Sequence, residues 1–471
     1  MTAKLVLRPD RLFPADETAR SIACSLYQGV KNLPIVSPHG HTDPAWFALN
    51  KPFANPSDLL IVPDHYLFRM LYSQGIGLER LGIPRVDGSP SESDPRAIWR
   101  LFAENYHLFR GTPSRLWLDW VFAEVFGIDV RLSGATADVY YDAIDHALQQ
   151  PEFRPRALFE RFGIEVLATT DGALDALEHH QVIRESGWSG RVITAYRPDQ
   201  VTDPDHPEFA SSLDRFGELA AEEVSTWAGY LRAHERRRAF FRDAGATSTD
   251  HGHPTPFTAD LPGPDAELLY AKVRSGDFSP REAELFRGQV LTEMARMSID
   301  DGMVMQIHPG VYRSHNPAVL TRFGADKGAD IPVVTEYVRN LKPLLDRFGS
   351  DSRLTLVLFT LDESTYSREL APLAGHYPAL RLGPPWWFND SPEGMRRFRE
   401  QVTETAGFTN MAGFVDDTRA FLSIPARHDV ARRVDCGFLA RLVAEHRLEE
   451  DEAHEIARLL AYDLTKQAYK L

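Results

Sequence analysis

The sequence has only two cysteines, Cys24 and Cys436, among 471 residues. So few cysteines exclude a disulfide framework and make the reducing cytoplasm the expected location. No apolar run approaches the ~20 residues that a membrane-spanning helix needs. The first residues, MTAKLVLRPDRLFPADE, also contain no apolar core of signal-peptide length. We therefore expect no membrane among the partners of this chain.

The sequence also contains fewer basic than acidic side chains. The chain has 52 lysines and arginines against 67 aspartates and glutamates, which gives a formal net charge of -15. No block of basic residues interrupts this excess, so we expect no nucleic-acid partner, because a phosphate backbone is bound by clustered basic side chains. An acidic protein that binds a small anion needs a local cluster of arginines for that purpose.

A short apolar segment recurs along the chain, followed by a polar or glycine-containing tip and then by a helical pattern. There are eight such segments: LPIVSPHGH from Leu33, IEVLATTD from Ile164, RVITAYRPD from Arg191, GATSTDHGH from Gly245, GMVMQIHPG from Gly302, RLTLVLFTLD from Arg353, ALRLGPPWWFND from Ala379 and NMAGFVDDTR from Asn410. Helical patterns that open with Ser-Pro begin at Ser279 and Ser391, and this pair is typical of an N-cap and first helical position. Strands that alternate with helices predict an α/β protein with a parallel sheet, and eight units predict a (β/α)8 TIM-type barrel.

The spacing of the segments predicts the domain organisation. More than a hundred residues separate the first strand from the second, and they include the helical patterns DHYLFRMLYSQG and SRLWLDWVFAEVFG. We interpret this stretch as a helical insertion after strand 1. The alternative is a separate N-terminal domain, which would divide the polar motifs between two sites. The predicted parts are an N-terminal helical segment at 1–32, strand 1 with its loop at 33–55, the insertion at 56–160, and the remaining barrel with C-terminal helices at 161–471.

Polar residues follow the apolar run in most of these segments, where a barrel enzyme places its active site. They are His39, His41, Asp171, Arg197, Asp250, His308, Asp362, Trp387, Asp417 and Arg419. Each has a purely structural alternative: Asp171 or Asp362 could cap the next helix, and His308 could be a satisfied core histidine. His39 and His41 are two residues apart, so both imidazoles can point to one side of a strand end and bind a metal. A simple polar turn is the alternative for this pair.

Several longer motifs resemble one known family nearly end to end and in the same order. They are SPHGHTDP, DHYLFRML, ITAYRPD, STDHGHP, MQIHPGVYRSHN, WWFNDSPEGM and DDTRAFLSIPARHD. They resemble the uronate isomerase (glucuronate isomerase) family of the amidohydrolase superfamily. The resemblance implies an intramolecular oxidoreductase that converts D-glucuronate to D-fructuronate and D-galacturonate to D-tagaturonate. Gly172, Ala195, Tyr196 and Pro309 depart from the common pattern and leave the preference between the two uronates open.

The resemblance implies one divalent metal ion held by His39, His41 and Asp417. Three protein ligands with open positions are typical of a catalytic site, and zinc suits two imidazoles and a carboxylate. The alternative is that these residues act without a metal, because an enediol mechanism can use acids and bases alone.

Isomerisation moves a proton from C2 to C1, and Tyr66 is the first candidate to carry it. A nearby arginine lowers the pKa of a tyrosine, and Arg419 could supply that charge and also bind the enediolate. His65, Asp417 and His39 are the other candidate catalytic groups. The structural alternative is that Tyr66 belongs to the packing face of a helix.

For recognition of the sugar acid we select Arg197, Arg313 and His308, with Trp387 as an apolar wall against the ring. Asp250 is expected to orient an arginine or a sugar hydroxyl. For Trp387 the structural alternative is a place in the core.

Two other functions compete with the isomerase. One is a metal-dependent amidohydrolase or lactonase acting on a sugar acid, but such enzymes usually add metal-binding histidines on strands 5 and 6, and the sixth segment, FTLDES, has none. The other is an inactive barrel that only binds a sugar acid. We expect a small-molecule uronate substrate and a homo-oligomer.

Overall fold

The computed structural model describes residues 3–471. Seven strands form one parallel sheet in the order β1-β2-β3-β4-β5-β8-β9. Their bounds are β1 Ile35–Ser37, β2 Ile164–Gly172, β3 Arg191–Arg197, β4 Ser248–His251, β5 Val304–Ile307, β8 Leu356–Leu358 and β9 Leu380–Leu382. All seven coincide with predicted segments, and the predicted α/β barrel is confirmed by this sheet and its surrounding helices.

The eighth predicted strand is reduced to a single parallel bridge between Leu382 and Met411. Gly413 has a φ of 79°, which interrupts the extended backbone and prevents a longer ladder. The segment nevertheless occupies the eighth position of the barrel, because further along it the carbonyl of Thr418 accepts the N–H of His41 at 3.1 Å. It therefore lies between the last strand and the first.

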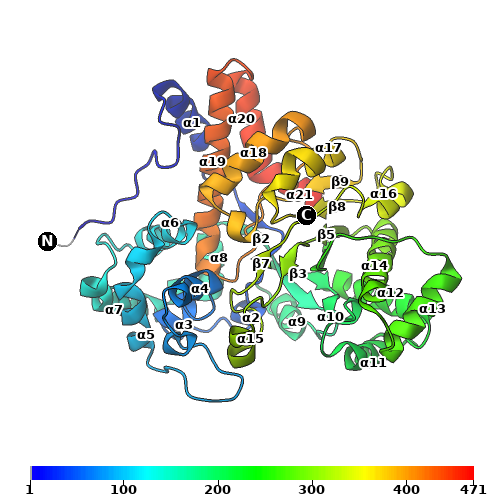
Figure 1. Ribbon diagram of the computed structural model, residues 1–471. Coiled ribbons are helices and arrows are strands. Elements are labelled where there is room, and N and C mark those ends of the chain that lie inside the picture. The colour runs from blue at the N-terminus through cyan, green and yellow to red at the C-terminus, as the bar shows by residue number, and fades with distance from the viewer. Residues whose placement is uncertain (1–2) are drawn as a thin grey trace.

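Seven α-helices lie between β1 and β2, in the blue to cyan part of Figure 1. They are α2 Pro44–Leu49, α3 Pro56–Leu60, α4 His65–Ser73, α5 Pro95–Glu104, α6 Pro113–Trp120, α7 Ala137–Leu148 and α8 Pro155–Arg161. Their apolar faces bury a cluster rich in aromatic rings, which includes Trp99, Phe102, Tyr106 and Phe122. α4 carries His65 and Tyr66 and so links this helical region to the site described below.

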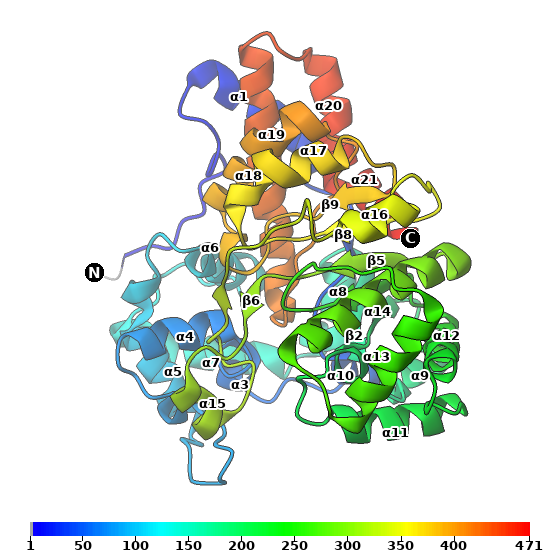
Figure 2. The same ribbon diagram turned by 45° about the vertical axis from the view of Figure 1, so that its right-hand side comes forward.

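Most of the other helices lie around the sheet, but α15 (Pro317–Phe323) packs against the helical region between β1 and β2 (Figures 1 and 2). These other helices are α1 Glu17–Val30, α9 Glu178–Glu185, α10 Asp199–Thr202, α11 Phe209–Ala220, α12 Trp227–Asp243, α13 Gly263–Ser275, α14 Pro280–Asp301, α15 Pro317–Phe323, α16 Lys342–Phe348, α17 Ala371–Ala374, α18 Pro392–Ala406, α19 Ile424–Ala444, α20 Glu450–Arg458 and α21 Leu464–Tyr469. Ser279 and Ser391 cap α14 and α18 as predicted, and each side chain accepts an N–H from the first helical turn. Within residues 3–471, no helix is both long enough and apolar enough to cross a membrane.

Two features place the site at one end of the barrel. The C-terminal residues Ala468 and Tyr469 pack with Val304, Val357 and Ala412, and the Tyr469 hydroxyl donates to Gln306 on β5 at 2.9 Å. At the opposite end, the carboxyl ends of the strands open into loops. The excursion between β5 and β8 contains a small antiparallel pair, β6 Val311–Tyr312 and β7 Ile331–Pro332, which the sequence did not predict.

Candidate active site

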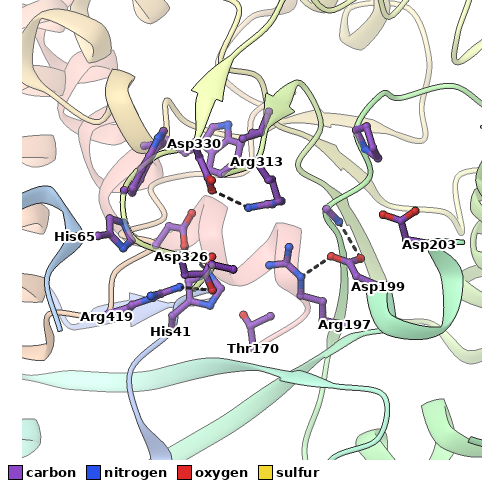
Figure 3. A pocket seen from close by; sticks show the side chains of 18 of the residues that line it. His41, His65, Thr170, Arg197, Asp199, Asp203, Arg313, Asp326, Asp330 and Arg419 are labelled. Carbon is purple, nitrogen blue, oxygen red and sulfur yellow. Dashed lines mark hydrogen bonds and ion pairs between the residues drawn. The ribbon is translucent and has the colours of Figure 1, made fainter. Parts of the chain in front are cut away.

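A cavity of about 570 Å³ lies at the carboxyl ends of the strands, and Figure 3 shows the side chains that line it. Seven predicted site residues line this cavity: His41, His65, Arg197, Arg313, Trp387, Asp417 and Arg419. They come from six separate parts of the chain, from the loop after β1 to the eighth segment. The other predicted residues, His39, Tyr66, Asp250 and His308, are buried in the surrounding structure.

His39, His41 and Asp417 form one compact group whose donor atoms lie within 4.8 Å of one another. The Asp417 Oδ1 atom lies 3.5 Å from His39 Nε2 and 3.1 Å from His41 Nε2. Burial lowers the pKa of His39 to about 4, so its imidazole is neutral near pH 7 and offers a lone pair. Burial alone would raise the pKa of Asp417, but the facing imidazoles of His39 and His41 hold it well below its ordinary value. Two imidazole nitrogens and a carboxylate oxygen fit a divalent cation.

A second row of polar side chains lies behind this group. The Asp250 carboxylate, which is fully buried, accepts from His308 Nδ1 at 2.6 Å and pairs with Arg197 Nη1 at 3.0 Å. The His308 ring stacks on His39, with their centroids 4.8 Å apart. Of the two partners expected for Asp250, the structure therefore provides an arginine. His308 Nε2 is buried and has no hydrogen-bond partner among residues 3–471, so this histidine is not a satisfied core residue.

The expected pairing of Tyr66 with Arg419 is wrong. The Tyr66 hydroxyl donates to the Trp387 carbonyl at 3.3 Å, and the guanidinium near its ring, 5.2 Å from the centroid, belongs to Arg427. Burial raises the pKa of Tyr66 above its ordinary value, so the lowered pKa that proton transfer needs does not arise. Arg419 pairs instead with Asp326.

His65, the neighbour of Tyr66 on α4, lines the cavity directly. Both of its ring nitrogens are buried and lack hydrogen-bond partners within the described part of the chain. Burial, and then the charge of Arg419, lowers the pKa of His65 well below its ordinary value. A neutral imidazole with two free nitrogens can donate to one substrate oxygen and accept from another.

Each arginine of the cavity is paired with an aspartate. Arg197 lies 2.8 Å from Asp199, Arg313 lies 3.2 Å from Asp330, and Arg419 lies 3.4 Å from Asp326. These three aspartates were not among the site residues predicted from the sequence. Asp199 could have been predicted, because it follows Arg197 by two residues in the motif ITAYRPD. The other two, Asp326 and Asp330, lie in the short loop between α15 and β7, where no strand or helix periodicity predicts their position.

Comparison with known proteins gives a consistent result over the whole chain. Residues 16–469 match a family model described as glucuronate isomerase. A uronate isomerase from Phenylobacterium zucineum is 66% identical over 471 residues, which is 100% of this chain and 98% of that protein. The crystal structure of glucuronate isomerase from Caulobacter crescentus has a TM-score of 0.98 at 61% identity, over 99% of this chain and 97% of that one. A uronate isomerase structure from Thermotoga maritima has a TM-score of 0.91 at 27% identity, over 98% of this chain and 99% of that one.

The amidohydrolase or lactonase alternative is not favoured. The relatives are isomerases, and β8 is followed by Phe359, Thr360, Leu361 and Asp362, with no histidine to complete a hydrolase site. Sequence, barrel and cavity agree with the full-length match, and the chain belongs to the glucuronate isomerase family.

Proposed function

We propose that this enzyme interconverts D-glucuronate with D-fructuronate, and D-galacturonate with D-tagaturonate. The proton moves from C2 to C1 through a cis-enediol. The observation that carries this proposal is the cavity itself, which brings together a group of two imidazoles and a carboxylate and three arginines. A sugar acid needs both features, one for its reacting carbon atoms and the other for its carboxylate.

We assign one divalent ion to His39, His41 and Asp417, and zinc suits this donor set best. The charges of the cavity support an ion. Its lining contains three arginines and five aspartates, which leaves it two positive charges short of neutrality before an anionic substrate enters. A divalent ion would remove this deficit. When bound, the ion would supply Lewis-acid polarisation of a substrate oxygen.

We assign recognition of the uronate carboxylate to Arg197 and Arg313, and stabilisation of the enediolate to Arg419. A guanidinium binds a carboxylate through two parallel N–H bonds, which fixes orientation as well as charge. Asp250 and His308 act behind the cavity, where Asp250 holds the Arg197 guanidinium in place. Trp387 lines the cavity and provides an apolar wall for the sugar ring.

We assign proton transfer to Asp417 and His65, because both line the cavity and Tyr66 does not. Asp417 is held ionised by the facing imidazoles, so it can accept a proton from a substrate hydroxyl. His65 has both nitrogens free to receive or return a proton. Tyr66 is a positioning residue, whose hydroxyl bonds the backbone of Trp387.

The test is to incubate the metal-loaded enzyme with each uronate and to follow the appearance of a ketose by NMR. Asp417→Asn keeps the shape of the side chain and should lower kcat by roughly two to four orders of magnitude. Asp346→Asn, at an exposed position of α16, removes the same charge away from the cavity and should leave kcat unchanged. Wild-type enzyme that forms no ketose from either uronate would overturn the proposal.

We also propose that the enzyme works in the cytoplasm as a homo-oligomer. The low cysteine content supports the location, and light scattering of the purified protein would give the assembly. A mass equal to one 53.1 kDa chain would overturn the second part of this proposal.

A further inference from the structure

The segment from Gly324 to Asp330 crosses the mouth of the cavity between α15 and β7. Gly324, Asp326 and Gly328 all have positive φ, at 82°, 59° and 71°. Gly328 is pressed against α4, since a Cβ atom there would lie 2.8 Å from Arg69 Cβ and 3.0 Å from the His65 carbonyl oxygen. The glycines therefore let the segment turn tightly, and Asp326 sits at its tip in a conformation that costs about 1 kcal/mol or more.

This tip carries a carboxylate into the group of arginines (Figure 3). Asp326 Oδ2 lies 3.4 Å from Arg419 Nη2, and both residues line the cavity with Arg197 and Arg313. Partial desolvation in the cavity would raise the pKa of Asp326, but the positive charges of Arg419, Arg313 and Arg197 hold it below its ordinary value. The Asp326 carboxylate thus contacts one guanidinium of a cavity that contains three, which is the environment that a bound uronate would seek.

Asp326 is also held less firmly than the other aspartates that pair with these arginines. Its side chain is 56% exposed, and an exposed ion pair of this kind contributes little. By contrast, Asp250 is fully buried between Arg197 and His308. Asp330 accepts both the Arg313 guanidinium and the backbone N–H of Ser314. Asp326 is therefore the carboxylate that an entering anion would replace.

We propose that Asp326 is a specificity-determining residue, which supplies a carboxylate to the arginine cluster of the cavity before substrate binds and is displaced when a uronate enters. The inference rests on the proposed function, because it takes the substrate to be a uronate. A uronate brings a carboxylate of its own, so the summed charge of the three arginines stays compensated when Asp326 leaves. A neutral aldose brings no charge, so it must either share the cavity with Asp326 or leave the arginine cluster uncompensated, and it is rejected.

The test uses binding without turnover. L-gulonate is D-glucuronate with its aldehyde reduced, so it keeps the carboxylate and cannot isomerise. D-glucitol is the same polyol with the carboxylate reduced to an alcohol. Asp326→Asn removes the competing charge, and asparagine tolerates the positive φ at this position. If Asp326 occupies the site for about 70–90% of the time, its removal tightens binding by about three- to tenfold.

In calorimetric titrations we expect Asp326→Asn to bind L-gulonate about three- to tenfold more tightly than the wild type and to bind D-glucitol no better. Asp326→Gly also fits the backbone and should behave in the same way, and the charge-matched control Asp346→Asn should bind L-gulonate like the wild type. Unchanged or weaker L-gulonate binding in both Asp326 variants, with unchanged melting temperatures, overturns the inference. An equal gain in affinity for D-glucitol also overturns the inference, because the substitution would then act by enlarging the cavity and not by removing a charge. Ketose formation by the wild type is measured separately, so a failure of the proposed function is recognised independently.

Discussion

At the scale of single residues, His39 is the point at which two groups of side chains meet. It belongs to the group with His41 and Asp417 and also to a buried group with Asp250 and His308. Burial keeps its imidazole neutral, which suits a metal ligand and would suit a cationic acid poorly. The metal assignment therefore depends more on His39 than on any other residue.

The double change His39→Asn plus His41→Asn should remove the bound ion. Wild-type enzyme should contain about one divalent ion per chain by elemental analysis, and the variant should contain almost none. His107→Asn plus His146→Asn removes two exposed histidines from the helical region and should leave the metal content unchanged. A double His39 and His41 variant with full metal occupancy would refute the assignment.

Tyr66→Phe should have a small effect. The hydroxyl makes one long bond, to the Trp387 carbonyl, so its loss should cost at most about 1 kcal/mol and lower kcat by less than about tenfold. Steady-state kinetics and a melting curve measure both quantities. A fall in kcat of about a hundredfold or more, at an unchanged melting temperature, would return proton transfer to Tyr66.

Some contacts among these residues could be predicted from the sequence, and others could not. The convergence of His39 and His41 follows from the period of two in a strand, and the proximity of Asp417 follows from the closure of a barrel. The partner of the Tyr66 side chain could not be predicted from strand period or barrel closure. Arg419 was a reasonable choice, but the tip at Asp326 pairs with it, and Arg427 approaches Tyr66 from α19. Those contacts depend on loop conformation, which no periodic pattern encodes.

At the scale of elements, the sequence predicted the strands well where they alternate with helices, and it failed where an element is very short. β6 and β7 contain two residues each, which is too few for any alternation to be visible. The eighth strand was predicted from its apolar residues, but Gly413 limits its pairing to one bridge. The helices with Ser-Pro starts were predicted correctly, because capping is a local property.

Ser279→Ala should loosen the first turn of α14. The Ser279 hydroxyl accepts the backbone N–H of Glu282, and the Glu282 carboxylate accepts the backbone N–H of Ser279. The change therefore removes a capping box. A loss of about 1 kcal/mol corresponds to about fivefold faster hydrogen exchange at the amides of this turn. Ser350→Ala, at an exposed position, is the control and should leave these amides unchanged. Equal exchange in Ser279→Ala and the wild type would show that the cap contributes nothing.

At the scale of the whole molecule, folding places several histidines in surroundings where they cannot easily be charged. Burial lowers the pKa of His39 to about 4 and that of His251 to about 3, and it lowers the pKa of His234 well below its ordinary value. In the unfolded chain these groups have an ordinary pKa near 6.5. Between about pH 6.5 and pH 4 the unfolded state therefore binds more protons than the folded state, and stability falls as the pH is lowered.

We expect the urea midpoint of the metal-free protein to decrease steadily from about pH 6.5 to about pH 5.5, above the range in which most carboxylates titrate. Each such histidine contributes up to about 1.4 kcal/mol per pH unit in this range. His251→Gln should make the dependence shallower by about one proton, whereas His376→Gln, which changes a histidine with no such burial, should not alter it. A midpoint that does not change with pH over this range would show that these histidines are accessible to protons in the folded state.

The proposed reaction moves a proton between C2 and C1 of a uronate. An NMR time course with D-glucuronate labelled with ¹³C at C2, metal-loaded enzyme and deuterated water follows this step at the reacting carbon. We expect the labelled carbon to change from a carbon bearing one hydrogen to the carbonyl or hemiketal carbon of a ketose. Any deuterium taken up during turnover should lie at C1 of the ketose or C2 of the aldose. A labelled carbon that keeps its hydrogen, or deuterium at any other carbon, would show that the enzyme does not move a proton between C2 and C1.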